Sequence, residues 1–302
     1  MKPKQSTEQD WGGKWTEVKL NSFIEYVRAY LTILNKFPHY KSIYFDGFAG
    51  LGEKITTKAK KTDLFNFEVN DNELTELHVY QGSAARVLKL EPPYQFAYYY
   101  FIETNEKSVD SLNLLRQSID HIPRSQIIIR KEDCNSQLEL LALALKKPNF
   151  TALILLDPFG MQINWSSISN LRGTHSDIWI LIPSGVAINR LLGTSGELMA
   201  LDRLTAFFGL SESEIRGIFY PPKEEETLFG TQKTNKKIDK PIDKIVEIYQ
   251  RQLKTVWKNV SNPLILKNSK NNPIFHLIFA SNNSTGLKIA NYIIDKNSPK
   301  NI

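Results

Sequence analysis

The sequence predicts an α/β protein in which helices cover an open, mostly parallel β-sheet. Short apolar runs alternate with helical patterns between residues 41 and 182, which is typical of such sheets. The apolar runs are rich in Ile, Leu, Tyr and Phe, as in strands that are buried on both faces. Several of them end in an acidic residue. We therefore expect a single domain over residues 1–302, with a ligand at the carboxyl ends of the strands.

The predicted elements begin with an amphipathic helix over residues 16–35. Apolar side chains recur there at helical spacing, as at Leu20, Phe23 and Val27. Five strands are expected next, at residues 41–46, 97–102, 126–130, 151–156 and 177–182. Helical patterns lie between most of them, at residues 83–90, 106–118, 136–144 and 165–171. This order predicts five parallel strands with helical crossovers.

The pattern changes after residue 182, and we interpret residues 186–260 as a mostly helical insertion. Residues 220–240 are charged, contain prolines and show no apolar period, whereas residues 244–258 are again helical in pattern. Two strand-like runs, 263–267 and 274–280, are joined by a polar turn and predict an antiparallel terminal hairpin. The sheet is therefore expected to have seven strands.

Composition limits the classes of protein to consider. No apolar run approaches the length of a membrane span, and the polar first residues contain no apolar segment of a signal peptide. We expect a cytoplasmic protein without membrane contact. The single Cys134 excludes an internal disulfide, and no His or Cys residues fall at metal-ligand spacing, so no metal is expected. The net charge of +6 favours a polyanionic partner, unless the many Lys and Asn residues reflect a compositional bias of the source.

The strand at residues 41–46 ends in Asp46 and runs into a glycine-dense turn, which lets the backbone approach a ligand closely. Two nucleotide motifs do not fit: the third glycine of a dinucleotide fingerprint is replaced by Ile55, and no Walker loop is present. The pattern D-x-F-x-G-x-G remains. It resembles the first motif of class I methyltransferases that use S-adenosylmethionine (SAM), a Rossmann-like family, and is formed by Asp46, Phe48, Gly50 and Gly52. An ordinary strand followed by a turn is the competing interpretation.

Two further acidic residues stand at expected strand ends, Glu103 and Asp133. In enzymes of this kind the first would accept hydrogen bonds from the ribose hydroxyls and the second from the adenine amino group. Glu103 follows Asp46 by 57 residues, whereas a minimal βαβ unit needs about 20. We interpret the excess, residues 53–81, as an inserted loop beside the cofactor.

The fourth predicted strand ends in Asp157-Pro158-Phe159-Gly160. Proline forces the residue before it into an extended conformation, so Asp157 is expected at the strand tip. The segment resembles the [DNS]-P-P-[YF] motif of amino-methyltransferases, although Phe159 replaces the second proline. We predict that Asp157, Pro158 and Phe159 hold an amine for methylation. A strand stop with a hydrophobic plug is the alternative. Methylation at cytosine C5 is disfavoured because it needs a Pro-Cys pair that the chain lacks, and Cys134 is expected to be a small buried residue.

Segments along nearly the whole chain resemble the three-Cys-motif partner family (TcmP). The resemblance rests on YFDGFAG (44–50), GSAAR (82–86), YFIETN (100–105), EDCN (132–135), LLDPFGMQINW (155–165) and FHLIFAS (275–281). It implies a SAM-dependent methyltransferase-like fold and, as a possible partner, a radical-SAM-like protein that bears three cysteines. It does not imply a particular substrate.

Basic residues suggest what the substrate is. The expected loop after the glycine turn carries Lys54, Lys58, Lys60 and Lys61, followed by phenylalanines that suit bases. Arg190, after a Gly-containing turn, is a second candidate for a phosphate contact. A solvated loop and an internal ion pair are the alternatives. The preferred hypothesis is a SAM-dependent N-methyltransferase acting on nucleic acid. A SAM-binding accessory subunit of a radical-SAM-like protein, or a methyltransferase for proteins or small molecules, are the other hypotheses.

Overall fold

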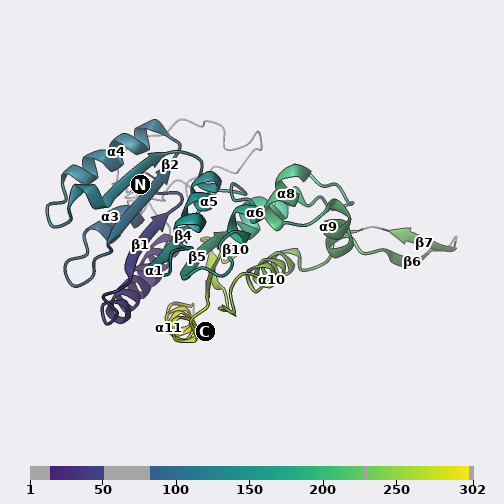
Figure 1. The fold of residues 1–302 in the computed structure, drawn as a ribbon. Helices are drawn as coiled ribbons and strands as arrows, with labels where there is room; N and C mark the ends of the chain where they lie inside the picture. Colours follow the sequence, from purple (N-terminus) through teal and green to yellow (C-terminus); the bar gives the residue numbers. More distant parts are fainter. Residues whose placement is uncertain (1–13, 51–81, 228–229, 235, 299–302) are drawn as a thin grey trace, which may run out of the picture.

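A computed structural model describes residues 14–50, 82–227, 230–234 and 236–298 of the chain. Its centre is an eight-stranded sheet in the order β3-β2-β1-β4-β5-β10-β8, with β9 also paired to β10 (Figure 1). The strands are β1 (Lys41–Asp46), β2 (Tyr98–Glu103), β3 (Ile127–Lys131), β4 (Phe150–Leu156), β5 (Ser176–Ile182), β8 (Asn259–Val260), β9 (Leu264–Lys267) and β10 (Pro273–Ser281). Strands β1 to β5 are parallel, which gives a Rossmann-like α/β fold.

The predicted antiparallel hairpin at the end of the chain is confirmed by β9 and β10. Strand β10 pairs antiparallel with β5 on one side and with both β9 and β8 on the other, so the last strand lies inside the sheet. The prediction of seven strands is wrong by one. The additional strand β8 has two residues, which is too short for a period-2 pattern to show in the sequence.

Helices cover both faces of the sheet, and each face has its own apolar core. One core contains α1 (Lys14–Leu34), α3 (Ser83–Leu88), α4 (Glu106–Gln117) and α11 (Ser284–Asn297). The other contains α5 (Cys134–Ala144), α6 (Trp165–Ser169), α8 (Leu201–Phe208), α9 (Glu212–Phe219) and α10 (Pro241–Leu253). Side chains of one strand alternate between them: Leu153 and Leu155 belong to the first core, Ile154 to the second.

The segment over residues 186–260 contains several helices and one element that the sequence did not predict. Strands β6 (Lys223–Thr227) and β7 (Gly230–Thr234) form an antiparallel hairpin that projects away from the body of the molecule (Figure 1). The backbone pairs although the segment has no apolar period, so the apolar pattern of the sequence did not reveal this hairpin. The expected loop over residues 53–81 lies outside the described residues.

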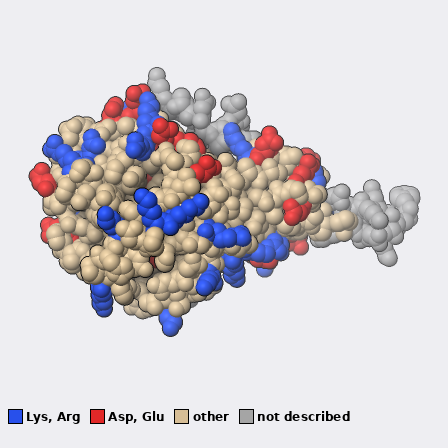
Figure 2. Space-filling view, in the orientation of Figure 1, with Lys and Arg blue, Asp and Glu red and all other residues tan. Residues whose placement is uncertain are grey.

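The surface carries its charges unevenly. Figure 2 shows Lys and Arg side chains across the middle of one face, with Asp and Glu nearer the edges of that face. Among the described helices, none is long and apolar enough to cross a lipid bilayer.

Candidate functional site

The candidate site lies where β2, β1 and β4 end side by side, because the carboxyl ends of neighbouring parallel strands meet at one edge of the sheet. Strand β1 runs into a turn in which Gly50 has a φ of 62°, a conformation that favours glycine. Gly47 is required for a different reason. A Cβ there would lie 2.6 Å from the Sγ of Cys134 and 2.7 Å from Cδ2 of Leu156. The turn is therefore packed directly onto the core.

Asp46 ends β1, and its carboxylate is fully buried. Its Oδ2 accepts hydrogen bonds from the hydroxyls of Tyr44 (3.0 Å) and Ser83 (2.7 Å), and its Oδ1 from the backbone N–H of Phe48 (3.2 Å). Burial raises the pKa of Asp46 to about 6, although these three hydrogen bonds act in the opposite direction. Asp46 thus connects β1, α3 and the glycine turn through hydrogen bonds. Its contact with a cofactor stays a prediction.

Glu103, at the end of β2, is bonded to the same turn. Its Oε2 accepts a hydrogen bond from the backbone N–H of Gly50 at 3.0 Å. Its Oε1 accepts from the N–H groups of Thr104 (2.8 Å) and Asn105 (2.9 Å). A carboxylate has about four acceptor positions, so one position on Oε2 remains for a ligand. Glu103 can accordingly accept from one ribose hydroxyl where the sequence suggested two.

Asp133 follows β3 and caps α5. Its Oδ1 accepts from the backbone N–H groups of Asn135 (2.9 Å) and Ser136 (3.4 Å). Within the described part of the chain its Oδ2 has no hydrogen-bond partner, and the residue is exposed. One oxygen is therefore used for the helix cap and the other can accept from a ligand. The predicted adenine contact is compatible with this geometry and stays a prediction.

Asp157, after β4, contacts a residue that sequence reasoning missed. The Nζ of Lys19 on α1 lies 2.5 Å from Oδ2 of Asp157, and both side chains are almost completely buried. Burial lowers the pKa of the Lys19 ammonium, while the charges of Asp157 and Asp46 act in the opposite direction. The signal that could have revealed Lys19 is its position on the apolar side of α1, four residues before the buried Phe23.

The remaining predicted site residues differ in their surroundings. Pro158 is buried after β4, Phe159 is half-buried, and Phe48 packs against the core. Cys134 is buried and has no disulfide, as the sequence predicted. Gly52 and the lysines Lys54, Lys58, Lys60 and Lys61 lie outside the described residues.

Arg190 is half-buried in the short helix α7 (Asn189–Leu191), which follows a π-helical turn, η2 (Ser184–Ile188). The glycine of this turn, Gly185, is closed by protein: a Cβ there would lie 2.2 Å from the carbonyl oxygen of Pro273. Close packing against β10 therefore explains why position 185 is a glycine, and this turn offers no open space for an anion. Phosphate binding by Arg190 stays a prediction.

Lys237, in the segment that follows the β6–β7 hairpin, has a structural role. The Nζ of Lys237 donates to the carbonyl oxygens of Asn189 (2.7 Å) and Leu192 (2.6 Å). It satisfies backbone acceptors at the end of α7 and joins residue 237 to the start of the insertion. Among the described residues, no group of three or more His, Cys, Asp or Glu side chains is arranged to hold a metal ion.

Comparisons with known proteins add little to this description. No model of a known protein family matches the chain, and no curated protein matches it. Among solved structures, the chain is similar to protein LPL1258 from Legionella pneumophila strain Philadelphia 1, assigned to family DUF519. The similarity covers 94% of this chain and 92% of that chain, with 12% sequence identity and a TM-score of 0.46. At this identity and TM-score, the resemblance gives no indication of function.

Proposed function

We propose that this protein is a SAM-dependent methyltransferase that acts on an exocyclic amine in nucleic acid. The observation that carries the proposal is the hydrogen bond between Glu103 and the N–H of Gly50. This hydrogen bond joins the acidic residue at the end of β2 to the glycine turn after β1. Rossmann-like folds use these two features, the acidic strand end and the glycine turn, to bind the ribose of a nucleotide and the groups next to it. The remaining acceptor position of Oε2 suits one ribose hydroxyl.

The order of the strands supports SAM over a dinucleotide. In the class I methyltransferases that the sequence resembles, five parallel strands are followed by a terminal hairpin whose last strand is inserted antiparallel. Strand β10 has this position between β5 and β8. Asp133, with one free carboxylate oxygen at the end of β3, supports an adenine contact next to the ribose contact of Glu103.

SAM supplies an electrophilic methyl group on its sulfonium. The chain's own residues then have to hold the amine with its lone pair toward that methyl group, which needs acceptors for the amine hydrogens. The carbonyl and carboxylate of Asp157 are suitable acceptors, and the contact with the Nζ of Lys19 holds that carboxylate in place. Pro158 fixes the backbone here, and the half-buried ring of Phe159 follows it in the chain.

Transfer of labelled methyl from SAM to total RNA, total DNA and lysate protein tests the proposal directly. We expect label in one nucleic acid. Asp157→Asn should lower turnover while SAM affinity, measured by calorimetry, stays within about twofold, because the carboxylate acts on the acceptor. Asp110→Asn, an exposed change on α4, is the matched control. Label in protein alone would assign a protein substrate instead, and an active Asp157→Ala variant would remove Asp157 from the site.

One observation favours a second candidate, a SAM-binding accessory subunit of a radical-SAM-like protein. The carboxylate of Asp157 is buried and already paired with Lys19, so it needs no substrate to satisfy its charge. The two candidates differ in one result. An accessory subunit binds SAM but transfers no label to any fraction alone, and a methyltransferase transfers label without a partner.

A further inference from the structure

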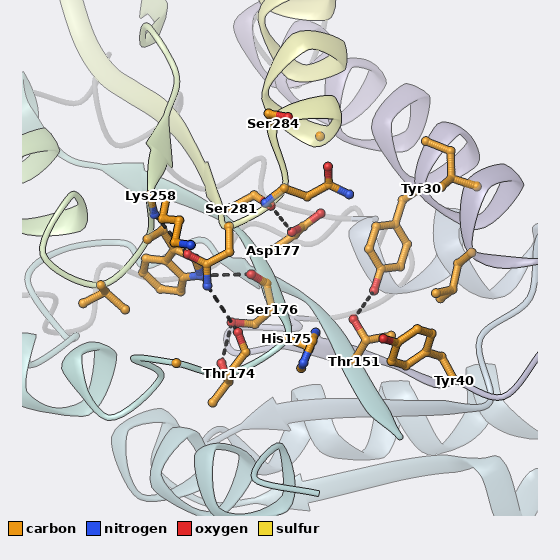
Figure 3. Close-up of a pocket in the computed structure, with 18 of the residues that line it drawn as sticks. Tyr30, Tyr40, Thr151, Thr174, His175, Ser176, Asp177, Lys258, Ser281 and Ser284 are labelled. Atoms are coloured by element: carbon orange, nitrogen blue, oxygen red, sulfur yellow. Dashed lines mark hydrogen bonds between the residues drawn. The ribbon is translucent and has the colours of Figure 1, made fainter. Parts of the chain in front are cut away.

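A groove of about 1100 Å³ opens on the edge of the sheet opposite the candidate site. Its floor is formed where β4 and β5 begin and β10 ends. Its walls are the second half of α1, the segment that follows α10 (residues 254–258) and the start of α11. In Figure 3, Asp177 and Ser281 lie at its centre, with Tyr30 and Tyr40 on one side and Lys258 on the other. None of its lining residues belongs to the proposed methyl-transfer site.

Three exposed cations lie on the rim, Arg172, Lys254 and Lys258. Among the described residues, none of the three has a carboxylate within salt-bridge distance. The only acidic lining residue is Asp177, and its two oxygens accept hydrogen bonds from Ser281 (2.5 Å) and Tyr26 (2.7 Å). The rim therefore attracts anions, and the single negative charge of the groove is held at its floor by hydroxyl groups.

A row of rings lies along the α1 side of the groove. Phe37 is 47% exposed, so its ring is accessible from solvent. The ring centroids of Phe37 and His39 are 6.3 Å apart, and those of His39 and Tyr40 are 4.3 Å apart. The ring centroids of Tyr40 and His175 are 6.0 Å apart. All four residues line the groove. Successive accessible rings are the surface on which unpaired bases stack.

The size and openness of the groove bear on the length of its ligand. Sites for small molecules usually measure about 300–1,000 Å³ and enclose most of the ligand. This groove is slightly larger than that range, and its cations and rings lie on exposed walls. A duplex presents its phosphates but keeps the faces of its bases stacked, so it would leave the row of rings unused.

We propose that the groove binds a short single-stranded segment of nucleic acid, with phosphates against Arg172, Lys254 and Lys258 and bases against the row of rings. The segment binds on the edge of the sheet opposite the methyl-transfer site. The inference goes beyond the proposed function, since it needs binding only and names a second contact surface.

Fluorescence anisotropy with a labelled oligouridylate of about eight nucleotides tests the proposal on the full chain without SAM. The variant Arg172→Glu/Lys254→Glu should raise Kd about tenfold or more. It should also reduce the slope of log affinity against log salt by about 1.4, the value for two lost contacts with single-stranded phosphates. The matched control is Arg124→Glu/Lys270→Glu, which makes the same charge change outside the groove and should stay within about twofold. Phe37→Ala should weaken binding at unchanged salt slope.

Circular dichroism and thermal unfolding establish that each variant is folded. Equal loss of affinity in the groove variant and the control would overturn the proposal, because it would mean that net charge alone attracts the oligonucleotide. Duplex RNA bound as tightly as the single strand, or uridine monophosphate bound as tightly as the oligonucleotide, would overturn the single-stranded segment as the ligand. Since SAM is absent, a failure here is separate from a failure of methyl transfer.

Discussion

Lys19 and Asp157 are 138 positions apart in the chain, yet their side chains form a buried ion pair with an N–O distance of 2.5 Å. The pair joins α1 to the end of β4. Removal of one partner leaves the other charge buried without compensation, which costs far more than the loss of a surface pair.

We therefore predict that Lys19→Met lowers the free energy of unfolding by about 3–5 kcal/mol in denaturant titrations. The double variant Lys19→Met/Asp157→Leu should lose less than the sum of the two single variants, because no buried charge remains. Lys296→Met is the control: its exposed pair with Glu25 is screened by water, so the unfolding midpoint should hardly change. Additive single variants would show that the pair does not couple the helix to the strand.

Glu103 provides a prediction on cofactor affinity. Glu103→Gln keeps the shape of the side chain but removes its charge and part of its acceptor capacity. The Kd for SAM should rise about tenfold or more, the equivalent of about 1.5–3 kcal/mol for a hydrogen bond to a charged group. Calorimetry is the measurement. Glu132→Gln changes an exposed neighbouring carboxylate at the end of β3 and should leave the Kd within about twofold. An unchanged Kd in Glu103→Gln would reject the ribose assignment.

Asp46 provides a prediction on pH. Its pKa is raised by burial from 3.8 to about 6, so between these values the folded protein holds a proton that the unfolded chain has released. Its contribution to stability is present below pH 4 and is lost as the pH rises through about 6; it amounts to about 3 kcal/mol. Asp46→Asn should thus flatten the fall in unfolding free energy between pH 4 and pH 6.

The pKa of Asp177 is likewise raised to about 6 by burial, so part of the slope should remain in Asp46→Asn. The double variant Asp46→Asn/Asp177→Asn should be flatter than either single variant. Denaturant titrations across this pH range give the comparison. A slope in Asp46→Asn equal to that of the wild type would mean that Asp46 is ionised in the folded state at low pH.

Gly47 provides a prediction on packing. Gly47→Ala would bring a methyl group to 2.6 Å from the Sγ of Cys134, and such overpacking should cost about 1–3 kcal/mol. Cys134→Ala in the same chain should restore part of the loss. In Gly217→Ala, at an exposed position of α9, the added Cβ meets nothing within 4 Å, and the helix should gain about 0.5–1 kcal/mol. Thermal unfolding ranks the three variants, and a neutral Gly47→Ala would contradict the tight contact.

The local pattern of apolar and polar residues was sufficient to predict most strands of the sheet and the helices between them. Strand β1 has the predicted bounds, and the helices α1, α4 and α5 begin and end within two residues of their predicted positions. Burial on both faces leaves continuous apolar runs, and the N-cap residues Asn105 and Asp133 mark two helix starts. The β6–β7 hairpin left no such pattern, because the charged run at residues 223–226 contains no apolar residues that could alternate with polar ones.

Contacts between distant segments could not be predicted in this way. The acidic residues at the strand ends could be identified in the sequence, but their partners could not. Only the folded structure brings Lys19 into an ion pair with Asp157 and the N–H of Gly50 into a hydrogen bond with Glu103. The groove is built from parts of α1, β4, β5, β10 and α11 and from the segment that follows α10, and none of them carries a motif. Sequence reasoning therefore identified candidate residues at one edge of the sheet and missed the other edge.

The inserted position of β10 has a consequence for synthesis of the chain. Residues 273–281 come near the end of the sequence but hydrogen-bond with β5, β8 and β9 inside the sheet. On the ribosome, the earlier strands therefore emerge with β5 as an unprotected edge, open to pairing with other nascent chains. The sheet closes only when residues 273–281 have been translated. Premature termination before residue 273 would leave that edge permanently exposed, and we expect such fragments to aggregate or to be degraded.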